Sequence, residues 1–372
     1  MSSPVPTPSA PRPRAFGIHI GTLEPGAENA ITDVAGVTVG HVTVWRDEPE
    51  PPAGRGVART GVTAVLPGPA DTLFDAPAPA GAAVLNGAGE LTGFLQVSEW
   101  GQIETPIFLT STMAVGRVYD GAVSAALAAD PRVGTEGVVI PVVAECDDSW
   151  LNDARTVQVE REDVGRTVAA ATAGPVAEGC VGAGAGMTAF DWKAGIGTAS
   201  RALHEPEATV GVLVLANFGA AAELRVDGVP VGRQLLPPDQ DRPAPAGSCI
   251  AVVATDAPLS SAQLTRIARR AGLGLARTGS VAHHGSGEIF VAFSTSRAPR
   301  SLARERRPVE LIPDRLLDPL FAATVEATEE AVLNALWAAV DIVGRNGRRA
   351  HALPHSPVLE LLEASNRLQS CS

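Results

Sequence analysis

The feature that most constrains this chain is an abrupt change of composition at Gly247-Ser248. The run before it, residues 236–243, is polar and rich in proline, which suits neither a helix interior nor a central strand. The run after it, residues 249–255, is apolar and β-branched and predicts a buried strand. Taken alone, the junction favours a surface loop that enters a strand at a serine. It also suits a nucleophile made by chain cleavage, because a freed Ser248 carries an α-amine with a pKa of roughly 7.7–8.0 that can act as a base.

The composition is that of a globular protein with a sizeable core, with 372 residues of which 45% are hydrophobic and 19% charged. Strand-like and helical patterns mix along the whole length, without an internal repeat or a break that marks a second domain. We therefore expect one layered α/β or α+β domain over residues 15–372. Residues 1–14 are rich in proline and serine and lack an apolar segment, which predicts a disordered tail rather than a signal peptide.

Several classes of function are disfavoured by the sequence. The formal charge of −12 argues against nucleic acid as a partner. No apolar run is long enough to cross a membrane, so we expect no membrane association and a cytoplasmic location. The chain contains no P-loop motif, no HExxH motif and no closely spaced cysteine pair, and we therefore expect no cofactor and no metal. It also lacks the GxSxG elbow of the α/β-hydrolases.

Two helices are well signalled near the C-terminal end of the chain. Ser260 and Gln263 form a capping box in front of an apolar helix face. Residues 320–343 give the longest helical pattern, which stops at Gly344.

Three further polar residues stand where a hydrolytic site can use them. Ser286 and Glu288 are two residues apart, so on an extended chain their side chains share a face and can orient a hydroxyl and an amine. Asn217 ends an apolar strand, where its amide can donate to a developing oxyanion. Each has a plainer interpretation, as a turn entering a strand or a strand-ending asparagine. Together with Ser248 they supply a nucleophile, a hydroxyl, a carboxylate and an amide donor without a histidine.

At these residues the chain resembles a known family, the self-cleaving D-aminopeptidase/amidase and β-aminopeptidase family of DmpA-like N-terminal serine hydrolases. The matching segments follow the family's order through most of the chain. They are residues 29–34 with 39–41, 86–93, 195–201, 213–219, 247–248 with the strand that follows, and 276–280 leading to 284–288.

The resemblance implies an α+β fold, a four-layer αββα sandwich like that of N-terminal nucleophile hydrolases but differently connected. It implies cleavage between Gly247 and Ser248 into an α-chain, residues 1–247, and a β-chain, residues 248–372, that stay together. In this scheme Ser248 is the nucleophile, Ser286 and Glu288 assist it and position its amine, and Asn217 serves the oxyanion hole. Members of the family assemble from several αβ pairs, and we expect a homotetramer.

The sequence departs from the family pattern around the expected substrate pocket. Glu145 matches the carboxylate that faces the substrate amine in the family, whereas Asp147 replaces an aromatic residue, often a tyrosine. Ala88 stands where a second asparagine is usual. Positions two apart on an extended backbone face the same way, so Glu145 and Asp147 can converge on one cation. The alternative is an acidic loop, Asp147-Asp148, that is simply solvated.

The predicted function is that of a self-processing N-terminal serine aminopeptidase/amidase. It would release N-terminal D-, L- or β-amino acids from short peptides, amides or esters through an acyl-enzyme. Two alternatives stay open: an acyltransferase of the ornithine acetyltransferase type, and a non-catalytic binding protein on the same fold. Transfer of the acyl group to an amine in preference to water would indicate the acyltransferase. A chain that remains uncut would indicate the binding protein.

Overall fold

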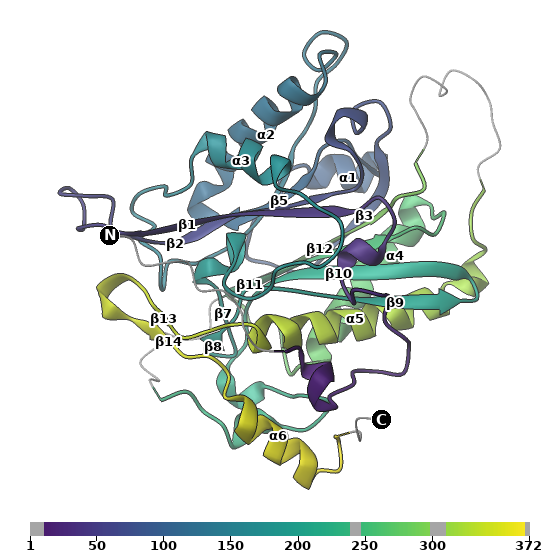
Figure 1. Ribbon diagram of the computed structural model, residues 1–372. Helices are drawn as coiled ribbons and strands as arrows, with labels where there is room; N and C mark the ends of the chain where they lie inside the picture. Colours follow the sequence, from purple (N-terminus) through teal and green to yellow (C-terminus); the bar gives the residue numbers. More distant parts are fainter. Residues whose placement is uncertain (1–10, 239–246, 298–309, 369–372) are drawn as a thin grey trace.

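The computed structural model describes residues 11–238, 247–297 and 310–368, and it has four layers (Figure 1). The two inner layers are β-sheets. The first has the strand order β1-β2-β5-β6 and comprises β1 (Thr38–Asp47), β2 (Val57–Leu66), β5 (Ile107–Ser111) and β6 (Val142–Cys146). The second has the order β4-β3-β12-β11-β10-β9 and comprises β3 (Ala78–Gly87), β4 (Gln102–Ile103), β9 (Ile196–His204), β10 (Glu207–Asn217), β11 (Gly247–Thr255) and β12 (Ser286–Ser294).

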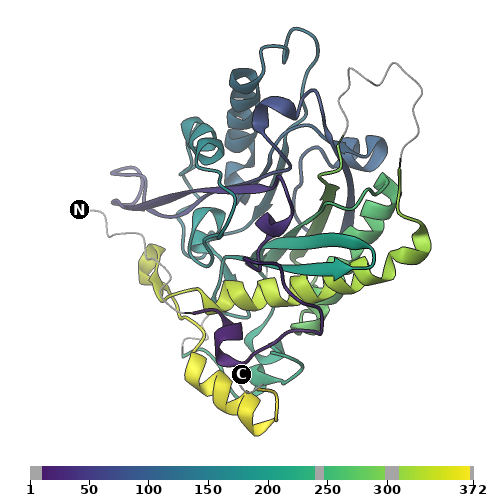
Figure 2. The same ribbon diagram turned by 45° about the vertical axis from the view of Figure 1, so that its right-hand side comes forward.

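Helices form the two outer layers. Those over the first sheet are α2 (Val115–Ala129) and α3 (Arg161–Ala169), and those over the second are α4 (Ser261–Arg277) and α5 (Asp318–Trp337). Figure 2 shows α5 lying along β9 and β10. The remaining α-helices and strands of the described residues are α1 (Phe94–Trp100), α6 (His355–Ala364) and two short hairpins, β7 (Thr188–Ala189) with β8 (Trp192–Lys193) and β13 (Ile342–Val343) with β14 (Arg349–Ala350). The predicted αββα architecture is confirmed.

Strand β11 has apolar side chains on both of its faces. Cys249, Ala251 and Val253 pack in the cluster under α4 and α5, whereas Ile250 and Val252 pack in the cluster between the two sheets. A strand covered on both sides has no solvated face, so its sequence is a continuous apolar run instead of an alternating one. This explains the composition after Ser248.

The register around β11 brings the candidate residues to one end of the second sheet. β11 runs antiparallel to β10, with Ser248 opposite Asn217, and parallel to β12, with Ser248 opposite Gly287. The three strands therefore present residues from three distant parts of the sequence beside the junction at Gly247-Ser248.

The predicted capping box of α4 is present. Ser260 Oγ accepts a hydrogen bond from the Gln263 main-chain nitrogen at 3.3 Å, and Gln263 Oε1 accepts one from the Ser260 nitrogen at 3.0 Å. Leu264 and Ile267 on the apolar face are buried against the second sheet. Among the described residues, no helix is both long and apolar enough to span a bilayer.

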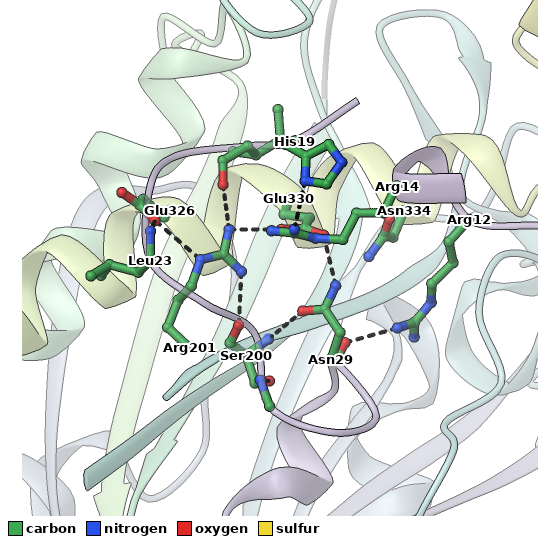
Figure 3. A network of polar contacts seen from close by, with 12 residues as sticks. Arg12, Arg14, His19, Leu23, Asn29, Ser200, Arg201, Glu326, Glu330 and Asn334 are labelled. Carbon is green, nitrogen blue, oxygen red and sulfur yellow. Dashed lines mark hydrogen bonds and ion pairs between the residues drawn. The ribbon is translucent and has the colours of Figure 1, made fainter. Parts of the chain in front are cut away.

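The N-terminal tail predicted over residues 1–14 needs correction where the structure describes it. Pro13–Phe16 forms a 3-10 helix, Arg12 Nε donates to Glu178 Oε2 at 2.7 Å, and Arg14 Nε donates to Glu330 Oε1 at 2.7 Å. Figure 3 shows Arg14 and Arg201 at the same carboxylate, because the buried Arg201 guanidinium also pairs with Glu330, at 2.7 Å. Because of these ion pairs, residues 11–14 belong to the fold. The proline- and serine-rich composition does not reveal the carboxylate partners, which lie far away in the sequence. Residues 1–10 lie outside the described residues.

Candidate active site

A cavity of about 670 Å³ opens at the end of the second sheet where β11 begins. Ser248 and Gly247 line it together with both acidic residues that the sequence pointed to, Glu145 and Asp147. Its volume lies in the range of ordinary small-molecule sites. The other lining residues are Ala88, Gly89, Thr112, Met113, Ser149, Ala154, Arg155, Gly285 and Arg345.

The Ser248 side chain is almost fully buried, at 4% exposed, and its hydroxyl donates to the Gly247 carbonyl oxygen at 2.7 Å. The serine therefore lies directly beside the carbonyl of the peptide bond that precedes it. Close packing depends on Gly287, because a Cβ there would lie 2.5 Å from the Ala88 carbonyl oxygen and 3.2 Å from Ser248 Oγ. Part of the predicted loop before this bond, residues 239–246, lies outside the described residues.

Asn217 lies opposite Ser248 in the antiparallel pair, so the two side chains share one face of the sheet. Its amide is fixed at both ends. Oδ1 accepts from the Thr188 nitrogen at 3.0 Å, and Nδ2 donates to the Asp147 carbonyl oxygen at 2.9 Å. An amide nitrogen carries two hydrogens, so one donor remains after the bond to Asp147. The structure therefore brings Asn217 to the nucleophile candidate in an orientation set by two neighbours.

Ser286 and Glu288 share a face, as predicted, and Ser286 Oγ donates to Glu288 Oε1. This face is not the one that carries the Ser248 side chain, because Ser248 pairs with Gly287, between them. Ser286 and Glu288 therefore lie near the main chain at the start of β11, and not near the hydroxyl of Ser248. Burial raises the pKa of Glu288, while the hydrogen bond from Ser286 lowers it. Glu288 Oε2 is buried and has no hydrogen-bond partner among the described residues.

Glu145 and Asp147 both reach the cavity from the end of β6, which brings the predicted carboxylate pair to one site. Glu145 is buried. Its Oε1 accepts from the Glu90 nitrogen at 2.9 Å and its Oε2 from Thr112 Oγ1. Burial is the main factor that raises the pKa of Glu145, and the nearby charge of Asp147 raises it further. Asp147 is exposed, and its Oδ1 accepts from the Ser149 nitrogen at 2.8 Å.

The alternative of a simply solvated acidic loop is wrong for Asp148. Its side chain is 0% exposed, and Oδ1 accepts from Ser111 Oγ at 2.9 Å and Asn152 Nδ2 at 3.0 Å. Burial raises the pKa of Asp148 to about 7. Asp148 therefore fixes the loop from inside while Asp147, its neighbour in sequence, faces the cavity.

Sequence reasoning missed the basic part of the cavity wall. Arg155 and Arg345 are far from Ser248 in sequence and belong to no pattern that marks a site. Thr112, which also lines the cavity, was not among the predicted site residues. Only the tertiary arrangement shows that these side chains meet at one cavity.

A buried serine at the head of a strand, in a sheet packed between a second sheet and a layer of helices, defines the class of αββα hydrolases of the N-terminal nucleophile type. Comparison with known proteins assigns the chain to one family within this class. Residues 29–350 match the model of peptidase family S58. The chain is 43% identical over 375 residues to the beta-peptidyl aminopeptidase BapA of Sphingosinicella microcystinivorans, which covers 96% of this chain and 93% of the relative.

Two solved structures show the same relationship. A Burkholderia sp. β-aminopeptidase is 41% identical with a TM-score of 0.86, over 95% of this chain and 98% of that one. The L-aminopeptidase D-Ala-esterase/amidase of Ochrobactrum anthropi, described as a prototype serine aminopeptidase with a variant of the Ntn hydrolase fold, is 36% identical with a TM-score of 0.90, over 97% and 100%. The chain belongs to peptidase family S58. Its predicted class, an aminopeptidase or amidase, is confirmed, and the acyltransferase and binding-protein alternatives are not favoured.

Proposed function

We propose that this protein cuts its own chain before Ser248 and then uses Ser248 as the nucleophile of an aminopeptidase. The observation that carries the proposal is the position of Ser248 Oγ, 2.7 Å from the Gly247 carbonyl oxygen inside a cavity that also contains Glu145. In the first reaction Oγ attacks the Gly247 carbonyl carbon, and the peptide bond to the Ser248 nitrogen breaks as an ester forms. Water then hydrolyses the ester, which leaves a Gly247 carboxylate and a free α-amine on Ser248.

In the mature enzyme the α-amine takes the proton of the Ser248 hydroxyl, and Oγ attacks the substrate carbonyl. The second hydrogen of Asn217 Nδ2 stabilises the oxyanion that forms, and the bonds to Thr188 and Asp147 keep the amide in place. Glu288 Oε2, which is buried and has no hydrogen-bond partner in the described part of the chain, accepts from the new amine at the start of β11. The leaving amine departs with a proton, and water releases the acyl group from Ser248.

Glu145 binds the α- or β-ammonium of the substrate's first residue. It lies near the nucleophile: a Cβ on Gly89 would meet Glu145 Oε1 at 2.9 Å and the Gly287 Cα at 3.8 Å, and Gly287 in turn pairs with Ser248. One short residue therefore fits between the carboxylate and Oγ. The substrates we propose are short peptides, amides or esters with a free N-terminal amine, including the β-peptides on which the BapA relative is named to act.

The test is the intact mass of the purified protein. We expect two fragments, the smaller beginning with Ser248, and activity toward aminoacyl p-nitroanilides. Ser248→Ala should remain one chain, whereas Ser149→Ala, a matched loss of a hydroxyl at the same cavity, should cut normally. A wild-type chain that remains uncut after long incubation contradicts the proposal.

We also propose a homotetramer of αβ units. Large apolar side chains are exposed on α1 and on β3, with Leu95 at 83%, Trp100 at 69% and Leu85 at 57%. Exposed apolar surface of this kind is typical of an interface. We place the protein in the cytoplasm, which agrees with the unbridged state of the cysteines among the described residues, Cys146, Cys180 and Cys249.

A further inference from the structure

The cavity that holds Ser248 has a basic part as well as an acidic part. Arg155 and Arg345 line it, and among the described residues no ion pair joins either of them to Glu145 or Asp147.

The two arginines come from separate segments that dock on each other. Arg345 follows β13, and its main-chain nitrogen donates to the Leu151 carbonyl oxygen at 2.8 Å. Arg348 in the same hairpin stacks over Trp150, 4.1 Å from the ring centroid. This docking fixes the backbone that carries Arg345 against residues 148–155, so its position at the cavity is built into the fold.

Arg155 already has carboxylate partners. Its Nε and Nη2 donate to the two oxygens of Asp153 at 2.9 and 2.6 Å, and Nη2 also donates to Glu50 at 3.1 Å. Asp153 is buried, and its pKa is lowered mainly by the hydrogen bond from Arg155. Asp153 is therefore an anion that Arg155 engages directly.

Arg345 has no such partner. Among the described residues its guanidinium makes no ion pair and no side-chain hydrogen bond, and its Nε is buried without an acceptor. Its charge reaches Asp153 only through space. A guanidinium presents five N–H donors in a planar fork that fits a carboxylate, so the terminal nitrogens of Arg345 can donate to a carboxylate that enters the cavity.

We propose that Arg345, with Arg155 beside it, binds the C-terminal carboxylate of the substrate and makes short, zwitterionic peptides the preferred substrates. The inference rests on the proposed function, because it assumes that Ser248 cleaves a peptide whose ammonium lies at Glu145. A cavity of about 670 Å³ accommodates a peptide of a few residues, so both ends of one molecule can reach their partners. A peptide that ends in an amide loses the ion pair with Arg345 but keeps the ammonium site.

The experiment compares three substrates that share the N-terminal residue released fastest by the wild type: a p-nitroanilide, a dipeptide acid and the same dipeptide as its C-terminal amide. We expect wild-type kcat/KM to favour the acid over the amide. Arg345→Gln should lower kcat/KM for the acid roughly 10- to 100-fold, the scale of a hydrogen-bonded charge, and leave the amide and the p-nitroanilide within about twofold. Arg349→Gln is the matched control, because Arg349 is exposed in the same hairpin outside the cavity lining.

The outcomes separate this inference from the proposed function. If the wild type hydrolyses none of the three substrates, the proposed function is wrong. If it hydrolyses the p-nitroanilide but treats acid and amide alike, or if Arg345→Gln lowers all three rates equally, the carboxylate site is overturned and the proposed function stands. If Arg345→Gln does not fold, the wild-type ratio of acid to amide decides alone, and Arg345→Lys should give an intermediate ratio.

Discussion

Replacing Glu145 with glutamine removes the proposed ammonium partner while changing the shape of the site very little. The buried carboxylate accepts from the Glu90 nitrogen and from the Thr112 hydroxyl. A glutamine oxygen can still accept from Glu90, and its NH₂ group can donate to the Thr112 hydroxyl, so the loop contacts survive. What disappears is a hydrogen bond between charged groups, worth about 1.5–3 kcal/mol.

That free energy corresponds to a loss of roughly 10- to 100-fold in kcat/KM. We expect the loss on a substrate with a free N-terminal amine and almost none on its acetylated counterpart. Steady-state kinetics on both substrates measure it, with Glu90→Gln as the control, because the hydrogen bond from Glu90 to the same carboxylate comes from its main chain. Equal losses on both substrates, or no loss on either, would show that the amine is held elsewhere.

The dependence on pH gives the same prediction a second readout. Burial raises the pKa of Glu145, so the carboxyl becomes neutral at a higher pH than an exposed glutamate and loses its attraction for an ammonium there. The ratio of kcat/KM for the free substrate to that for the blocked one should therefore rise with pH through this raised pKa. Protonation of the Ser248 amine affects both substrates and cancels in the ratio. In Glu145→Gln the ratio should stay flat from acidic to neutral pH.

Three other predictions follow from the geometry. Asn217→Ala should lower kcat roughly 10²–10³-fold, as for a lost oxyanion donor, and slow self-cleavage; a cleaved, folded variant with unchanged kcat would remove Asn217 from the site. Asp148 keeps its proton to a pKa of about 7 in the folded state, so the stability gained from its burial as a neutral acid is lost as pH rises toward and through 7. The change in Tm on Asp148→Asn should therefore be more favourable at pH 8 than at pH 5 by thermal melts, and an equal change at both would contradict the raised pKa. Trp100→Lys on α1 should reduce the mass seen by light scattering if that face is an interface, and an unchanged tetramer would place the interface elsewhere.

The sequence predicts the second sheet well where its strands are rich in branched residues, and poorly where they are not. β10 and β11 are apolar runs and were expected. No strand was predicted over β3, which begins Ala78-Pro79-Ala80-Gly81. Its small residues have a packing reason: a Cβ on Gly81 would lie 2.3 Å from the Thr265 nitrogen of α4. The helix approaches so closely that larger strand formers do not fit, and a single sequence does not show that contact.

The end of the longest helix was misplaced for a related reason. Residues 337–343 are apolar except for Asp341, so hydrophobicity indicates one helix to Gly344. In the structure α5 ends at Trp337, whose ring stacks on His355 at 3.9 Å between centroids, and Ile342–Val343 pairs with Arg349–Ala350. The local sequence does not reveal this hairpin. It therefore does not reveal where Arg345, which the hairpin carries, lies in the fold.

The sequence therefore identifies the residues proposed to act on the scissile bond, whereas only the structure identifies most of those proposed to recognise the substrate. The residues proposed to act on the scissile bond lie at the ends of strands, where a composition change, a two-residue spacing and a terminal asparagine mark them. The residues proposed to recognise the substrate lie on loops that meet only after folding, with Asp147 and Arg345 both supplied by segments beyond regular strands. Loops can change charge without disturbing the sheets that hold the nucleophile. Replacing Asp147 with an aromatic residue is therefore expected to change which peptides are cut while leaving the chemistry at Ser248 intact. An Asp147→Tyr variant should retain self-cleavage and shift the ranking of substrates, and a variant that loses self-cleavage would contradict this division.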